Sequence, residues 1–379
     1  MKVVVAIDSF KGCASSLELA EHIKEGILDV YPDGEIVICP IADGGEGTVE
    51  AFSKNDGVRL IRATCKDPLG NNIQAQYTIL KDNVAVIEMA SASGLPLIAL
   101  EKRDPSLTSS YGTGDLIKDA IKKGVREFIV GLGGSATNDA GLGMLISLGF
   151  RFLDKLGNEI SFARDLGDVI TIDKSKILKE LKECNFRVAC DVNNPLFGKN
   201  GATHVYAKQK GANQKMVIDL DKQLECFAKV VEEKSSKKLY DYPGAGAAGG
   251  MGFAFLVFLN AKLKSGIKIV LEQLDLENKI KDANFVITGE GKIDEQSSMG
   301  KVLSGIGGIC KKQGVPCIAL SGNSSEASDG LHKIGVSAYF SILDAPISLG
   351  EAMNKRVALD LIRKKTKQIF RLIKVSNQI

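Results

Sequence analysis

The beginning of the chain alternates strand patterns with amphipathic helix patterns, and this alternation limits the possible folds most strongly. Lys2–Ile7 is a continuous β-branched run, typical of a strand buried on both faces. A helix follows, for which Ser15 or Ser16 can serve as N-cap. A second strand, Glu35–Cys39, precedes another helix at about 48–54. Strands that alternate with helices predict a parallel sheet, whose ligands gather beyond the carboxyl ends of its strands.

The same alternation returns near the end of the chain, whereas the middle opens with strands joined by short turns. The late strands and helices are expected at 284–288, 300–312, 316–320, 335–342 and 349–374. Strands without intervening helices are expected at 58–63, 73–80 and 84–89. Their direct succession favours antiparallel pairing and a second domain.

We therefore predict an α/β protein of two domains. Residues 1–60 plus 284–379 are expected to form a parallel-sheet α/β domain, and residues 61–283 a mixed α/β domain. Within the second domain we expect a long helix at 213–233. An apolar helix should run from the glycine stretch at 243–252 to about 264.

A glycine-rich stretch, Gly131–Met144, follows the apolar run 127–130 and leads into a helix pattern. Glycines let the backbone approach a ligand, and a helix start offers free N–H groups to an anion. The predicted phosphate-binding residues here are Gly133, Gly134, Ser135, Thr137 and Asn138. Two alternatives remain: a merely tight turn, and a dinucleotide fingerprint at 131–136 with Asp154 about 20 residues on.

Six acidic residues sit in or beside glycine-rich loops: Asp8, Asp43, Asp139, Asp191, Glu290 and Asp294. Carboxylates at such places can hold magnesium or take a proton from an attacking hydroxyl, although any one of them could simply cap a helix. Lys11, Lys292 and Lys301 could neutralise a phosphate or a substrate carboxylate. Phosphoryl transfer requires mainly positioning and charge stabilisation, which these residue types supply.

Composition excludes several other classes of protein. The net charge of +3 over 379 residues gives no basis for binding nucleic acid or a membrane. The eight cysteines form no Cys-x-x-Cys pair that would indicate zinc, and no Walker A motif occurs. The N-terminus fits a first strand rather than a signal peptide, so we expect a cytoplasmic protein.

Several motifs together resemble the bacterial glycerate kinase family. They occur in chain order at 8–12, 42–48, 131–139, 189–196, 244–252 and 287–291. The resemblance implies ATP-dependent phosphorylation of D-glycerate, most often to 2-phosphoglycerate. It also implies one flavodoxin-like domain and one resembling restriction endonucleases. Among the departures, Ala207-Lys208 stands where Gly-Pro is expected before Gln209-Lys210-Gly211.

From the residues themselves we predict the following roles. The catalytic residues would be Asp191, Asp43 and Lys11, with Asp191 favoured as base. The substrate would be bound by Asp8, Ser9, Lys11, Glu46 and Asn193. ATP would also contact Gly246, Gly249 and Lys301, and Mg²⁺ would be held by Asp139, Glu290 and Asp294.

Two rival functions stay open at this point, an NAD(P)-dependent dehydrogenase of a small hydroxy acid and a non-catalytic nucleotide-binding sensor. We expect a monomer or homodimer.

Overall fold

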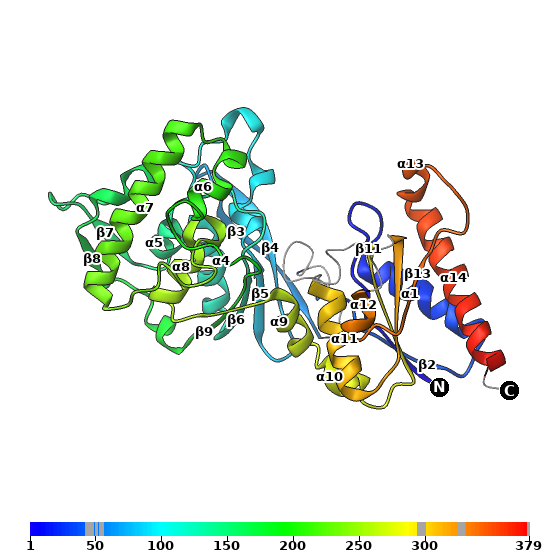
Figure 1. Cartoon of the computed structure of the whole chain (residues 1–379). Helices are drawn as coiled ribbons and strands as arrows, with labels where there is room; N and C mark the ends of the chain where they lie inside the picture. Colours follow the sequence, from blue (N-terminus) through cyan, green and yellow to red (C-terminus); the bar gives the residue numbers. More distant parts are fainter. Residues whose placement is uncertain (42–48, 50–51, 53–56, 294–300, 325–329, 377–379) are drawn as a thin grey trace. The chain divides into compact units, whose positions relative to one another are not determined.

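The structure is a computed structural model that describes residues 1–41, 49, 52, 57–293, 301–324 and 330–376 (Figure 1). The chain divides into two compact units, Met1–Asp43 with Ile267–Ile379, and Gly44–Gly266. The boundaries predicted from sequence stood at 60/61 and 283/284. The segment after Gly266 belongs to the first unit because Ile267 and Leu271 pack beside Gly305.

The first unit contains a five-stranded sheet in which every neighbouring pair is parallel. Its strands are β1 (Lys2–Val5), β2 (Glu35–Ile38), β11 (Phe285–Ile293), β12 (Cys317–Ser324) and β13 (Ala338–Ser341). Their spatial order is β2–β1–β11–β12–β13. Counted along the unit this is 2-1-3-4-5, the flavodoxin-like order. The parallel sheet predicted from both chain ends is confirmed.

Helices connect or follow the strands of the first unit, and the longer ones, such as α1 (Ser16–Leu28) and α14 (Lys355–Ser376), bury an apolar face. The others are α9 (Gly266–Gln273), α10 (Leu276–Ile280), α11 (Lys301–Gln313), α12 (Gly330–Lys333) and α13 (Leu349–Ala352). Of the two N-caps expected from the sequence, Ser15 caps α1, and it forms a capping box with Glu18. Helix α14 packs so close to α1 that a Cβ on Gly26 would lie 2.6 Å from the carbonyl oxygen of Arg363.

The second unit contains a six-stranded mixed sheet. Its strands are β3 (Arg59–Lys66), β4 (Asn72–Ile79), β5 (Val84–Glu88), β6 (Glu127–Gly131), β9 (Asn185–Ala189) and β10 (Lys262–Lys264). The order is β10–β9–β6–β5–β4–β3, antiparallel from β3 to β5 and parallel from β5 to β10. The antiparallel pairing predicted for the three early strands is confirmed.

The second unit contains further elements. They are α3 (Ala90–Ser93), α4 (Tyr111–Lys122), α5 (Leu142–Ser147), β7 (Arg151–Leu153), β8 (Thr171–Asp173), α6 (Ala202–Tyr206), α7 (Gln214–Ser235), α8 (Ala247–Phe258) and the 3₁₀ helices η1 (Leu95–Leu97), η2 (Leu100–Lys102), η3 (Ala163–Asp168), η4 (Lys179–Glu183) and η5 (Lys208–Lys210). The apolar helix expected to reach residue 264 instead ends at Phe258. Asn260 then adopts a left-handed φ of 51°, and β10 joins the sheet edge beside β9. Among the described residues, no helix is both long and apolar enough to cross a membrane.

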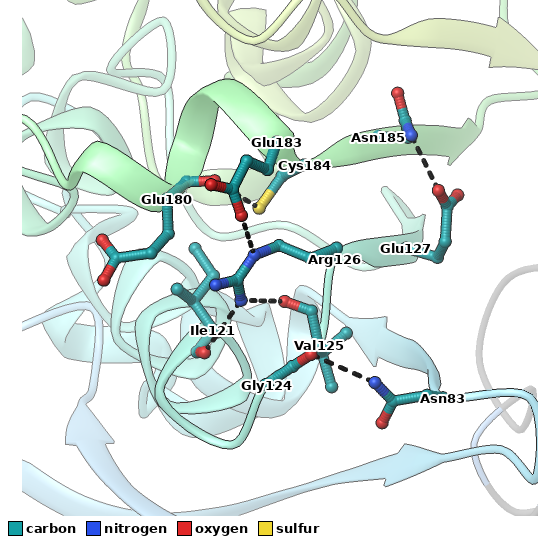
Figure 2. A network of polar contacts seen from close by, with 10 residues as sticks. All are labelled: Asn83, Ile121, Gly124, Val125, Arg126, Glu127, Glu180, Glu183, Cys184 and Asn185. Carbon is teal, nitrogen blue, oxygen red and sulfur yellow. Dashed lines mark hydrogen bonds and ion pairs between the residues drawn. The ribbon is translucent and has the colours of Figure 1, made fainter.

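A polar network fixes the amino ends of β6 and β9 (Figure 2). The Arg126 guanidinium donates to Glu183 and to the carbonyl oxygens of Ile121 and Val125, at 2.9–3.2 Å. The Asn185 side chain donates to Glu127 across the two strands at 2.7 Å. The loops beyond the carboxyl ends of β6 and β9, at the opposite edge of the sheet, are the expected place for a ligand.

Candidate active site

In the first unit, the switch in strand order lies between β1 and β11, and this is where a flavodoxin-like sheet binds ligands. Asp8 follows β1 there, and its backbone N–H donates to the carbonyl of Gly289 at 3.0 Å. Glu290 is the next residue of β11 and is half-buried. Two of the acids singled out in the sequence are thus brought to one sheet edge.

A short loop after Asp8 presents the neighbouring polar residues. The Asp8 carboxylate accepts the Ser9 backbone N–H at 2.7 Å, and Phe10 and Ala14 exchange two backbone hydrogen bonds. This closed turn leaves Lys11 exposed. The loop lies against β11, since a Cβ on Gly291 would be 3.6 Å from the Cα of Phe10. Asp8, Ser9, Lys11 and Glu290 therefore belong to one local cluster.

Four other predicted residues cannot be placed at this edge. Asp43, Glu46 and Asp294 lie outside the described residues. Lys301 is the first residue of α11, but its side chain is likewise outside the described part. Among the residues that the structure does describe, no group of three or more Asp, Glu, His or Cys side chains could hold a metal ion.

In the second unit, the glycine-rich stretch forms a turn between β6 and α5. Gly133 and Gly134 are exposed, and Gly134 has a left-handed φ of 71°. Ser135 is only 8% exposed, and Thr137 and Asn138 are fully buried. Asn138 donates to the Thr203 hydroxyl at 3.0 Å. Only the two glycines thus offer their backbone to a ligand, and the polar side chains after them shape the turn from within.

Asp139 occupies the helix start that we expected to receive a phosphate. Its carboxylate is fully buried and accepts four hydrogen bonds, from the N–H and hydroxyl of Ser110 at 2.8 Å and from the N–H groups of Gly141 and Gly143 at 3.1 Å. Burial raises the pKa of Asp139, and these donors act in the opposite direction. Every contacting group donates, so the ionised form suits the site. The Asp139 carboxylate thus organises the start of α5, and its role as a magnesium ligand stays a prediction.

The second glycine stretch is packed inside the second unit. Gly246 and Gly249 are buried, and added Cβ atoms would lie 2.2 Å from the Pro195 carbonyl oxygen and 2.0 Å from the Thr137 carbonyl oxygen. Gly249 also accepts the N–H of Ala140 at 2.9 Å. The glycines allow backbone to pack on backbone, which any side chain would prevent. Gly249 thus packs against the segment that follows the Gly133–Gly134 turn, and Gly246 packs against Pro195. The ATP contact expected of both glycines stays a prediction.

Asp191 and Asn193 follow β9, the neighbour of β6. Leu132 donates to the carbonyl of Ala189 at 3.3 Å, which places this segment beside the glycine turn. The Asp191 carboxylate is half-buried and accepts the N–H of Gly266, the first residue of α9, at 3.1 Å. Asn193 is exposed. Asp191 thus already stabilises a helix start, while remaining partly accessible.

Lys210 was not among the site residues predicted from the sequence. It ends η5, is only 2% exposed, and donates to the Ser135 hydroxyl at 2.8 Å and the Thr137 carbonyl at 2.7 Å. Burial lowers the pKa of Lys210 to about 7. In the sequence, the signal that could have pointed to Lys210 was the Gln209-Lys210-Gly211 run, which matches the family pattern.

Asp154, the acidic residue that the dinucleotide fingerprint at 131–136 would need, has another role in the structure. Asp154 accepts the N–H groups of Leu156 and Asn158, both at 2.8 Å, and so closes an exposed turn after β7. It is therefore occupied as a turn residue. The fold is thus a two-unit α/β protein. One unit carries an exposed glycine turn at Gly133–Gly134, and the other carries Asp8 and Glu290 where its strand order switches.

Known proteins identify this class more closely. Residues 3–374 match the sequence model of the glycerate kinase family. The glycerate 2-kinase of Escherichia coli (strain K12) is 45% identical over 371 residues, covering 97% of each chain. The glycerate kinase of Bacillus subtilis (strain 168) is 41% identical over 378 residues, covering 99% of this chain and 98% of that one.

Structural comparison agrees. A crystal structure from Salmonella typhimurium LT2, of a protein assigned as glycerate kinase 2, has a TM-score of 0.92 and 40% identity over the full length of both chains. The chain belongs to the glycerate kinase family.

Proposed function

We propose that the protein transfers the γ-phosphoryl group of MgATP to the 2-hydroxyl of D-glycerate, in the breakdown of organic acids. The observation that carries this proposal is the 45% identity to a glycerate 2-kinase over 97% of both chains. The exposure of Gly133 and Gly134 supports it, because glycine backbone without side chains beside it suits a phosphate.

The phosphates of ATP would lie against the Gly133–Gly134 turn, whose shape depends on Ser135, Thr137 and Asn138. Asp139 would mainly order the start of α5, since its oxygens accept four hydrogen bonds. Mg²⁺ would be held chiefly by Glu290 and Asp294, and when bound it would neutralise phosphate charge. Lys301 is kept as a candidate for phosphate contact.

Asp191 is our preferred base for the glycerate hydroxyl, ahead of Asp43. Its carboxylate is partly accessible and uses one oxygen to accept the N–H of Gly266. A base must be within hydrogen-bond reach of the hydroxyl it deprotonates. Lys11, exposed on its tight turn, would pair with the glycerate carboxylate. The other proposed substrate-binding residues are Asp8, Ser9, Glu46 and Asn193.

The proposal is tested by ADP release from purified protein supplied with MgATP and D-glycerate. Activity that depends on D-glycerate is expected. ATP binding without turnover would favour a sensor, and tight NADH binding with no response to ATP would favour a dehydrogenase.

An Asp191→Asn variant tests the proposed base. It should lower kcat by at least about 100-fold with little change in KM, because general-base catalysis typically contributes 10²–10⁴-fold. Asp154→Asn, in an exposed turn, is the matched control and should retain wild-type turnover. A raised KM with unchanged kcat would make Asp191 a binding residue instead.

A further inference from the structure

Lys210 is a buried amino group that is cationic when protonated, and its hydrogen-bond partners are uncharged. Its two acceptors are the hydroxyl of Ser135 and the carbonyl of Thr137. Within the part of the chain that the structure describes, it makes no ion pair. A buried ammonium is destabilising unless an opposite charge pairs with it, so an apolar residue of similar volume would suit a merely structural position at least as well.

The acidic side chain that attracts the Lys210 ammonium, Asp139, already accepts hydrogen bonds from other groups. Asp139 attracts the ammonium and acts to raise its pKa, but the Asp139 oxygens accept hydrogen bonds from Ser110, Gly141 and Gly143. The positive charge at Lys210 is thus only partly balanced within this unit. A phosphate at the neighbouring turn would supply the missing negative charge.

The position of Lys210 is fixed by its own segment. Gly211 follows it with a left-handed φ of 103°, and a Cβ on Gly211 would lie 2.2 Å from the carbonyl oxygen of Arg103. Since η5 is held closely in this way, the two hydrogen bonds from Lys210 tie the Ser135–Thr137 segment to a rigid support. This segment directly follows the exposed Gly133 and Gly134.

We propose that Lys210 is a positioning residue for ATP: its ammonium holds the turn so that the Gly133 and Gly134 amides face the phosphates, whose charge it balances. The proposal rests on the proposed kinase function and extends it to a residue with no assigned role. It requires no contact between Lys210 and glycerate. Loss of the ammonium should therefore weaken ATP use selectively.

The test compares Lys210→Met and Lys210→Gln with Lys208→Met, an exposed lysine of the same η5 segment. Both Lys210 variants should raise KM for ATP at least about tenfold while KM for D-glycerate stays within about twofold. The Lys208 variant should match the wild type. Equal changes in both KM values, or an unchanged KM for ATP in a folded variant, would overturn the proposal.

Equilibrium binding of a nonhydrolysable ATP analogue separates this proposal from the proposed function. If the wild type binds the analogue but does not phosphorylate glycerate, the proposed function fails, and Lys210 is judged by analogue affinity alone. Binding about tenfold weaker in the Lys210 variants supports the positioning role, and equal binding refutes it. If neither Lys210 variant folds, Lys210 is a structural residue and the proposal is wrong.

Discussion

Replacing Asp139 with asparagine should destabilise the protein strongly, because the carboxylate organises a buried turn. The side chain accepts four hydrogen bonds from three residues and is fully buried. An asparagine of the same shape offers one acceptor oxygen, and its NH₂ group would face a donor at the other position. At least one buried N–H of the turn would then lose its partner.

The size of the effect follows from these contacts. A buried donor left without an acceptor costs about 1–3 kcal/mol, and hydrogen bonds to a charged oxygen are stronger than those to a neutral one by about 1 kcal/mol. Burial of the charge raises the pKa of Asp139, and a neutral amide avoids that cost, so only part of the second contribution should be felt. Together these changes should lower the free energy of unfolding by about 2–4 kcal/mol. For domains of this size, that corresponds to a fall in melting temperature of about 5–15 °C.

Thermal unfolding of Asp139→Asn, followed by circular dichroism with and without MgATP, measures this effect. Asp154→Asn is a matched control, because Asp154 accepts backbone N–H groups in an exposed turn, where water can replace it. The control should melt close to the wild type. If Asp139→Asn keeps the wild-type melting temperature but needs more magnesium for activity, Asp139 is a metal ligand and our reasoning about the turn is wrong.

Two further changes test the support of the site and the capping of α1. Gly249→Ala should lower the free energy of unfolding by about 3 kcal/mol or more in urea denaturation, because its Cβ would lie 2.0 Å from the Thr137 carbonyl oxygen. Gly157→Ala, with a left-handed φ but nothing within 4 Å, isolates the backbone strain and should cost only about 1–2 kcal/mol; equal losses would refute the packing argument. The Ser15 N–H, with Lys355, lowers the pKa of Glu18 from 4.5 to about 2, so Glu18 should stabilise the fold above about pH 4.5 and lose this effect as the pH falls toward 2. Glu18→Gln should therefore melt below the wild type at about pH 6, with a gap that narrows by about pH 3; a gap independent of pH would contradict the capping assignment.

Features decided by neighbouring residues were predictable from the sequence. Ser15 and Glu18 lie three positions apart, so the capping box at the start of α1 is visible as a pattern. The turns that join β3, β4 and β5 are equally local, and the antiparallel pairing follows from them. The parallel sheet of the first unit was predictable for the same reason, since strand and helix patterns alternate at both ends of the chain.

Features decided by distant partners were not predictable in the same way. Asp139 is occupied by Ser110, which is 29 positions away, and Ser135 receives Lys210 from 75 positions away. Gly249 fits its glycine pattern, but only the fold shows that the backbone of Thr137 fills the space beside it. The apolar helix was extended too far because the pairing of β10 with β9 is a long-range contact.

Proton-coupled phosphorus NMR of the product tests whether the protein phosphorylates the 2-hydroxyl of D-glycerate, as we propose. A phosphate at C2 couples to one vicinal hydrogen, and a phosphate at C3 couples to two. We expect a new ester resonance, formed only with MgATP and D-glycerate, that appears as a doublet. A triplet would place the phosphate on C3, and the absence of any ester resonance alongside a folded, ATP-binding protein would refute glycerate phosphorylation.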